Sequence, residues 1–174
     1  DMPDPIKGLA LSCIISDTLE FRSPTTTRRD REVAERLAKD LKIDVSDYAS
    51  KLFRAKSDVS DFSDAQLLRM DSKKYPIADL MFRVSVLETT EPDMIFRRKS
   101  SLIEAMGTVC AEDSVDHVLF FVVDILREES TLLVPNKSVK KVAEKSFGVN
   151  VYDNSVLLPG VVSRKKQIIP NLKI

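Results

Sequence analysis

The stretch His117-Val118-Leu119-Phe120-Phe121-Val122-Val123-Asp124-Ile125 decides the fold that this chain can adopt. Every side chain from 118 to 123 is apolar, and most belong to the β-branched or aromatic types that strands favour. Alternate residues of a strand point to opposite faces, so such a run indicates a central strand that is buried on both faces. We therefore expect a sheet in the interior of a layered fold.

Predicted strands and helices alternate on both sides of this run. Residues 80–87 alternate and are rich in β-formers, which predicts a strand, and Pro92 opens an amphipathic helix that we expect to reach about Cys110. A helix over 138–147 is expected to end at Gly148. Further strands are predicted at 131–134, 149–152 and 155–158. Strands that alternate with helices indicate an α/β layer structure.

The first third of the chain predicts helices only. Residues 6–15 are almost wholly apolar and follow two prolines, which predicts a short buried helix. A threonine of 25–27 can cap a second helix, and Asp44 or Ser46 a third that extends to about residue 55. Residues 56–64 are rich in serine and aspartate, as linkers are, and we expect a domain boundary there.

Composition and charge exclude some classes of function. The 174 residues are 43% apolar and 31% charged, and 27 Lys plus Arg balance 27 Asp plus Glu. Because the formal net charge is zero, the protein has no strong overall electrostatic field, and neither nucleic acid nor a membrane surface is expected as a partner. The longest apolar stretches are too short to span a bilayer. Cys13 and Cys110 are isolated in apolar surroundings, which predicts buried thiols of a reducing compartment and hence a cytoplasmic protein.

A cationic segment near the end of the chain suggests a binding site for an anion. Val161-Val162-Ser163-Arg164-Lys165-Lys166-Gln167 follows a Pro-Gly turn, and no acidic residue occurs from Ser155 onward. Three adjacent cations repel one another, so an anion that bridges them would be stabilised. Arginine offers a planar fork for phosphate oxygens, and lysine a compact point charge. A solvated basic tail is the alternative reading.

A second motif lies near the other end, in Ile14-Ile15-Ser16-Asp17-Thr18-Leu19-Glu20-Phe21-Arg22-Ser23-Pro24-Thr25. Asp17 directly follows an apolar segment. A carboxylate in that position is costly unless it accepts hydrogen bonds, caps a helix or binds a metal ion. A cap or turn carboxylate therefore remains an alternative to a metal ligand.

Together the two motifs resemble those of a known family. Residues 14–25 resemble the last metal-binding motif of the manganese-dependent, family II inorganic pyrophosphatases of the DHH phosphoesterase superfamily. Leu157-Leu158-Pro159-Gly160-Val161-Val162-Ser163-Arg164-Lys165-Lys166-Gln167-Ile168-Ile169-Pro170 resembles that family's C-terminal substrate-binding signature. Asp71-Ser72-Lys73-Lys74-Tyr75 and Val123-Asp124-Ile125-Leu126 fall in the right order between them. The resemblance covers essentially the whole chain.

The resemblance implies roles for four residues. Asp17 corresponds to a carboxylate that ligates one of the catalytic metal ions, and Arg164 and Lys165 correspond to cations that grip pyrophosphate. Lys73 corresponds to a third phosphate-contacting cation, although a slip of one residue would exchange it with Lys74. No residue of this chain is implied to be a catalytic group itself. Asp124, at the end of a predicted buried strand, is interpreted as structural, and His117 as a surface histidine or one whose hydrogen bonds are satisfied.

The resemblance also implies the domain organisation. Residues 1–58 would be the C-terminal helical tail of the DHH catalytic domain, and 59–174 the DHHA2 substrate-binding domain. The implied fold is a mixed β-sheet flanked by helices, preceded by a short all-helical remnant. The family's Asp-His-His triplet is missing, and His117 is the only histidine. We therefore expect this chain to be part of a longer protein and to be inactive alone.

The implied activity is that of an inorganic diphosphatase. A metal-activated bridging water would hydrolyse pyrophosphate to two phosphates, with two or more Mn²⁺ ions (Mg²⁺ or Co²⁺ possible) in the intact enzyme. The implied partners are pyrophosphate, the N-terminal DHH domain and, in the intact enzyme, a second copy in a homodimer. One alternative is a non-catalytic phosphate-binding or regulatory module, and another is an exopolyphosphatase of the same superfamily. With only four glycines, the chain does not fit the glycine-rich nucleic-acid members.

Overall fold

The computed structural model describes residues 2–174. The chain divides into two compact units, Asp1–Asp58 and Val59–Ile174. Each unit has its own set of buried residues, and each is described by itself.

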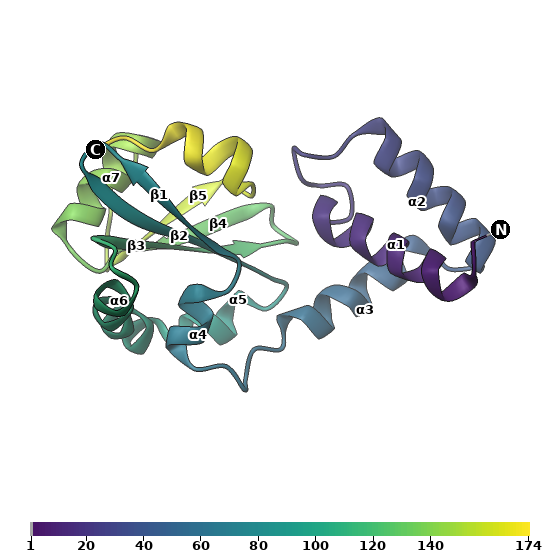
Figure 1. The fold of residues 1–174 in the computed structure, drawn as a ribbon, viewed down its shortest axis with the longest axis horizontal. Coiled ribbons are helices and arrows are strands. Elements are labelled where there is room, and N and C mark those ends of the chain that lie inside the picture. Colours follow the sequence, from purple (N-terminus) through teal and green to yellow (C-terminus); the bar gives the residue numbers. More distant parts are fainter. Residues whose placement is uncertain (1) are drawn as a thin grey trace. The chain divides into compact units, whose positions relative to one another are not determined.

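The first unit consists of α1 (Asp4–Thr18), α2 (Arg28–Leu41) and α3 (Val45–Ser57), and α1 packs against both of the others (Figure 1). Thr27 caps α2 in a capping box with Asp30, as the threonine run predicted. Asp44 caps α3 by accepting a hydrogen bond from the backbone nitrogen of Asp47.

Helix α1 corrects the prediction of a helix buried all round. Its inner face contains the buried Leu11 and Ile15, but Ile6 and Leu9 remain 48% and 63% exposed. Cys13 is also exposed, so the prediction of a buried thiol at this position was wrong, whereas Cys110 is partly buried. The run is apolar all round because α1 has two apolar faces, of which the other helices of its unit cover one.

The second unit is built on a five-stranded sheet in the order β1-β2-β3-β4-β5. The strands are β1 (Ser72–Ile77), β2 (Leu80–Thr89), β3 (His117–Asp124), β4 (Glu129–Leu133) and β5 (Ser155–Pro159). β2 and β3 are parallel and the other neighbouring pairs are antiparallel, so the sheet is mixed, and helices flank it. This confirms the predicted fold class.

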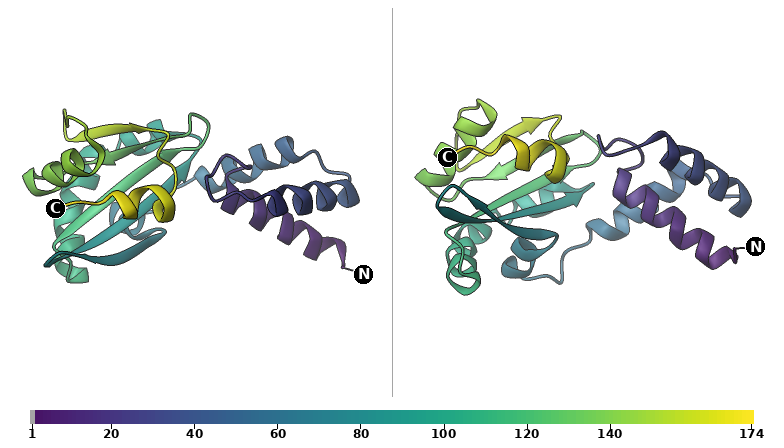
Figure 2. Two further views of the ribbon diagram at one scale, coloured as in Figure 1. Left: turned by 90° about the horizontal axis from the view of Figure 1, so that it is seen from above. Right: turned by 45° about the horizontal axis from the view of Figure 1, so that its top comes forward.

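β3 is the central strand and is buried on both faces, as predicted. On one face, Phe120 and Val122 belong to a core that includes residues of α4 (Asp64–Arg69), α5 (Pro92–Phe96) and α6 (Lys99–Asp113). On the other face, Phe121 contacts Phe147 of α7 (Lys137–Phe147) edge to face, with ring centroids 6.2 Å apart. Figures 1 and 2 show the C-terminal helical turns, η1 (Arg164–Ile168) and η2 (Ile169–Asn171), on the α7 side of the sheet.

Two predicted elements differ in the structure. The helix expected from Pro92 to Cys110 is broken into α5 and α6 at Arg97 and Arg98, and Arg98 pairs with Asp64 at 2.6 Å. The strand expected at 149–152 is only an isolated bridge between Tyr152 and Ser155. Among the described residues, no helix has the length and apolarity that crossing a bilayer requires.

A network of ion pairs joins α4, β2 and α6 on the α6 face. The carboxylate of Asp113 accepts hydrogen bonds from Arg69 Nε at 3.0 Å, and lies 2.8 Å from Arg83 Nη2. Burial raises the pKa of Asp113, but the hydrogen bond from Arg69 and the positive charges of Arg83, Arg69 and Lys74 outweigh it. The pKa of Asp113 therefore lies below its usual value.

We expect acid to weaken this network. Since the pKa of Asp113 is lower in the folded than in the unfolded chain, its carboxylate stabilises the fold fully above the unfolded value, about 3.9. That contribution is lost as the pH falls through the folded value. Urea unfolding at several pH values should show a smaller acid-induced loss in Asp113→Asn than in the wild type. An unchanged pH dependence in Asp113→Asn would contradict this role of Asp113. Asp61→Asn, at an exposed position, is the control and should retain the wild-type pH dependence.

Candidate functional site

The cationic segment is held in a fixed turn by its uncharged residues. Gln167 Oε1 accepts hydrogen bonds from the backbone nitrogens of Val162 and Ser163, both at 2.9 Å, and Gln167 Nε2 donates to the carbonyl of Gly160 at 2.6 Å. Ser163 Oγ accepts from the backbone nitrogen of Lys166, and Ile168 is fully buried. These contacts hold the turn independently of the charged ends of Arg164 and Lys165.

Arg164 connects this turn to the opposite edge of the sheet. Its Nη2 donates to Asp71 Oδ1 at 2.9 Å, and its Nη1 donates to the Asp71 carbonyl. The turn follows β5, whereas Asp71 directly precedes β1, and these strands are the two edges of the sheet. The chain thus crosses one face of the sheet and brings Arg164 next to the strand that carries Lys73.

The strand register separates Lys73 from Lys74. Lys74 pairs with Arg83 across β1 and β2, and its ammonium donates to the backbone carbonyl of Asp113, on the α6 face. Lys73 pairs with Val84, so its side chain lies on the other face, where η1 also lies. Lys73 therefore shares a face with the cationic turn, and Lys74 does not.

The ammonium groups of two lysines remain available. Lys73 and Lys165 are both exposed, and neither forms a side-chain hydrogen bond or ion pair with any other residue in 2–174. Arg164 uses two of its five N–H groups on Asp71 and is only 16% exposed. This arrangement can present one oriented guanidinium and two free ammonium groups to an anion.

Asp17 lies in the first unit, in the last turn of α1, and is exposed. Within the described part of the chain its carboxylate has no hydrogen-bond or ion-pair partner, so it caps nothing. A negative charge at the C-terminal end of a helix is disfavoured by the helix dipole, and no basic residue of the last turn offsets it. A bound cation would remove this penalty.

The turn after Asp17 is strained and strongly held. Leu19, Glu20 and Phe21 all have positive φ, at 50°, 52° and 68°, which non-glycine residues rarely adopt. Thr18 supports the turn with two hydrogen bonds. Its side-chain Oγ1 accepts from the backbone nitrogen of Phe21, and its backbone carbonyl accepts from the backbone nitrogen of Ser23. Strain that the surrounding contacts maintain is common at functional sites.

The described residues do not complete a metal site. No group of three or more His, Cys, Asp or Glu side chains that could hold a metal ion occurs in 2–174. Asp17 offers one carboxylate oxygen ligand of the kind that Mn²⁺ accepts. A manganese ion at Asp17 would therefore need further ligands from outside these residues.

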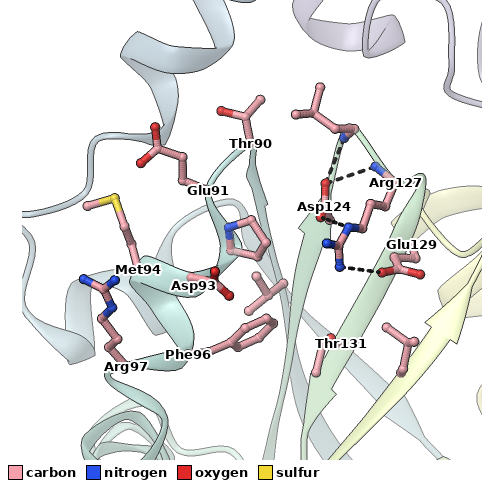
Figure 3. A pocket seen from close by; sticks show the side chains of 14 residues that line it. Thr90, Glu91, Asp93, Met94, Phe96, Arg97, Asp124, Arg127, Glu129 and Thr131 are labelled. Carbon is pink, nitrogen blue, oxygen red and sulfur yellow. Dashed lines mark hydrogen bonds and ion pairs between the residues drawn. The ribbon is translucent and has the colours of Figure 1, made fainter.

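A pocket of the second unit beside α5 is unsuited to a phosphate. It has a volume of about 770 Å³ and lies beside α5 at the ends of β2 and β3 (Figure 3). Four acidic residues and two arginines line it: Glu91, Asp93, Asp124, Glu129, Arg97 and Arg127. Arg127 is already paired with Asp124 and Glu129, and the acidic side chains of the pocket would repel a polyanion. The cationic turn and β1 are therefore the better anion site.

Asp124 has the structural role expected from the sequence. It is 8% exposed, and its Oδ1 accepts hydrogen bonds from the backbone nitrogens of Leu126 and Arg127 at 2.9 and 3.1 Å. His117 packs its ring against that of Phe82, with the ring centroids 5.4 Å apart.

The residue that sequence reasoning missed is Asp71. It occurs in a quoted motif, but its partner Arg164 lies 93 positions further along the chain.

Comparison with known proteins places the chain in a family. The DHHA2 domain matches residues 50–174. A Deinococcus radiodurans protein named "Probable manganese-dependent inorganic pyrophosphatase" is 42% identical over 170 residues, which cover 95% of this chain and 54% of that protein. A Lactobacillus helveticus protein of the same name is 35% identical over 173 residues, which cover 99% of this chain and 56% of that protein.

A solved structure shows the same relation. The crystal structure of "Methanococcus jannaschii putative family II inorganic pyrophosphatase" matches with a TM-score of 0.86 and 33% identity, over 98% of this chain and 55% of that one. The chain thus spans about half the length of the relatives it matches. These findings confirm the resemblance to manganese-dependent inorganic pyrophosphatases, and the chain belongs to the DHHA2 domain family.

Proposed function

We propose that this chain is the phosphate-gripping part of an inorganic pyrophosphatase, and that the intact protein hydrolyses pyrophosphate to two phosphates. The observation that carries the proposal is the arrangement of Arg164, clasped at the start of β1 by Asp71, with Lys73 and Lys165 free. The names of relatives that match nearly the whole chain support the same activity.

The three cations would act by electrostatics and orientation. Arg164 would bind two phosphate oxygens with its remaining N–H groups, and Lys73 and Lys165 would neutralise further oxygens as point charges. Phosphoryl transfer needs mainly positioning and charge stabilisation, which these groups provide. Lys73 is proposed in preference to Lys74 because Lys74 lies on the other face of the sheet and binds the Asp113 carbonyl.

The proposed cofactor is Mn²⁺, with Asp17 as one ligand. A bound manganese ion lowers the pKa of water and so supplies a nucleophile at neutral pH. This chain contributes an exposed carboxylate whose position at the end of α1 favours a cation. The remaining ligands are proposed to reside in another part of the intact protein, so we expect this chain alone to be inactive.

That other part is proposed to be the rest of an N-terminal DHH domain. Residues 1–58 would form the C-terminal tail of this domain, and residues 59–174 would form the DHHA2 domain that follows it. Its contact surface on this chain would be an apolar stripe on α1, formed by Ile6, Leu9 and Cys13. These residues are all exposed, and spacings of three and four place them on one helix face. The relatives are nearly twice as long as the match, which leaves room for such a domain.

The stripe predicts a context-dependent effect of Leu9→Ala. In the intact protein, where Leu9 would be buried, we expect this change to lower the free energy of unfolding by about 2 kcal/mol or more. In this chain alone, where Leu9 is 63% exposed, the loss should stay within about 0.5 kcal/mol. Urea unfolding of both proteins measures the difference. Equal effects in the two would reject the stripe as the docking surface.

The function itself is tested by assaying the intact protein with Mn²⁺ on pyrophosphate and on tripolyphosphate. We expect turnover of pyrophosphate to be preferred, and no turnover by the 174-residue chain alone. Preference for tripolyphosphate would indicate an exopolyphosphatase instead. Phosphate binding without any turnover by the intact protein would indicate a regulatory module.

A further inference from the structure

Asp71 holds Arg164 through two different atoms. Its Oδ1 and its backbone carbonyl both accept hydrogen bonds from the guanidinium, and the carbonyl also accepts from the backbone nitrogen of Val86 at 3.3 Å. Asp71 has φ of 36°, in the left-handed region that non-glycine residues seldom occupy. The unusual backbone directs the carbonyl and the carboxylate to the same guanidinium.

The contact orients Arg164 more than it stabilises the fold. The Asp71 side chain is 60% exposed, so water weakens its attraction to the guanidinium. A long arginine side chain has many rotamers, and fixing it before a ligand arrives lowers the entropy cost of binding. Two hydrogen bonds to one residue leave three N–H groups for an anion.

The position of Asp71 also links the cations. It lies two residues before Lys73 and directly before β1, the strand that brings this lysine to the η1 face. Arg164 is therefore fixed to the same strand end as Lys73, and Lys165 follows it in the chain. The negative charge of Asp71 offsets the mutual repulsion of these three cations when no ligand is bound.

We propose that Asp71 is a positioning residue, which holds the guanidinium of Arg164 in the orientation that grips inorganic pyrophosphate together with Lys73 and Lys165. This inference rests on the proposed function, because it requires Arg164 to bind phosphate. The opposite role would be competition, in which the Asp71 carboxylate occupies Arg164 and must be displaced by the anion. The two roles predict opposite changes in affinity.

Two substitutions separate these roles. Asp71→Gly removes the carboxylate and suits the positive φ, so it relieves the backbone. Asp71→Asn removes the charge but keeps an oxygen that can accept from Arg164 Nη2. Asp153 provides a matched control: it has φ of 48°, and its carbonyl and Oδ2 both accept from Lys99 Nζ.

Pyrophosphate binding by the full 174-residue chain is measured by isothermal titration calorimetry at fixed ionic strength. We expect Asp71→Gly to weaken binding about fivefold to tenfold, the cost of ordering one long side chain. Asp71→Asn should stay within about twofold of the wild type, because the orienting hydrogen bond is kept. Asp153→Gly should leave binding unchanged. Circular dichroism checks that each variant is folded.

Each other outcome has a defined meaning. Tighter binding in both Asp71 variants would show competition, and unchanged binding in Asp71→Gly would overturn positioning. If Arg164→Ala binds pyrophosphate as well as the wild type, the proposed function fails. If Arg164→Ala loses binding but Asp71→Gly does not, only the positioning role fails.

In the wild type, the Nε–H NMR signal of Arg164 should show slower motion than that of the exposed Arg29. Equal mobility of the two would also contradict positioning, even if Asp71→Gly does not fold.

Discussion

Replacing Arg164 by alanine is expected to lower pyrophosphate turnover by the intact protein about 100-fold to 1000-fold, the usual cost of removing one preorganised group that stabilises developing charge. Its guanidinium is the one cation of the site with a fixed orientation, at 2.9 Å from Asp71 Oδ1. A point charge from Lys165 or Lys73 cannot replace a fork that binds two oxygens. The measurement is steady-state release of phosphate with Mn²⁺ in excess.

Metal content distinguishes the proposed role of Arg164 from an indirect one. The cationic side chain of Arg164 is not a metal ligand. The amount of bound manganese, measured by atomic absorption, should therefore be nearly unchanged in Arg164→Ala. Lys165→Ala should also retain the metal but lose turnover. The control is Arg127→Ala, which removes an exposed arginine of the acidic pocket and should leave turnover near the wild-type value. Loss of manganese in Arg164→Ala would mean that its role is misassigned.

Replacing Phe120 by alanine is expected to lower the free energy of unfolding of the second unit by about 3–5 kcal/mol. Phe120 is fully buried in the central strand β3 and belongs to the core shared with α4, α5 and α6. The change removes a large apolar side chain and leaves a cavity that the close-packed sheet cannot fill.

Hydrogen exchange of the β3 amides provides the measurement. These amides exchange through unfolding of the second unit, so their rates report its stability separately from the first unit. Phe62→Ala is the matched control, because Phe62 is 39% exposed and its loss should cost about 0.5 kcal/mol or less. A loss below about 1 kcal/mol for Phe120→Ala would contradict the central place of β3 in the core.

The sheet was largely predictable where strands are apolar and was not where they are polar. The run at 118–123 identifies β3 because burial on both faces requires apolar residues at every position. β1 was missed because it is an edge strand of polar residues that contains Pro76, and only its pairing with β2 makes it a strand. The break between α5 and α6 was missed because no proline or glycine marks it in the sequence; Arg98, at the break, pairs with Asp64.

The candidate site was predictable as a set of residues but not as an arrangement. Arg164, Lys165, Lys73 and Asp17 were chosen from local motifs, and their roles remain proposals. Whether Lys73 or Lys74 shares the face of the cationic turn depends on the register with Val84 and Arg83, which the sequence does not show. The Asp71–Arg164 contact was also hidden, since it forms only when the chain crosses the sheet.

The most direct test of the central claim is an NMR titration of the uniformly ¹⁵N-labelled 174-residue chain with sodium pyrophosphate. If the cationic turn and the start of β1 grip the anion, the backbone signals that shift most should be those of 71–73 and 163–166. The same titration of Arg164→Ala should largely abolish these shifts. Shifts centred on Arg97 and Arg127 in the acidic pocket, or no localised shifts at millimolar pyrophosphate, would contradict the account.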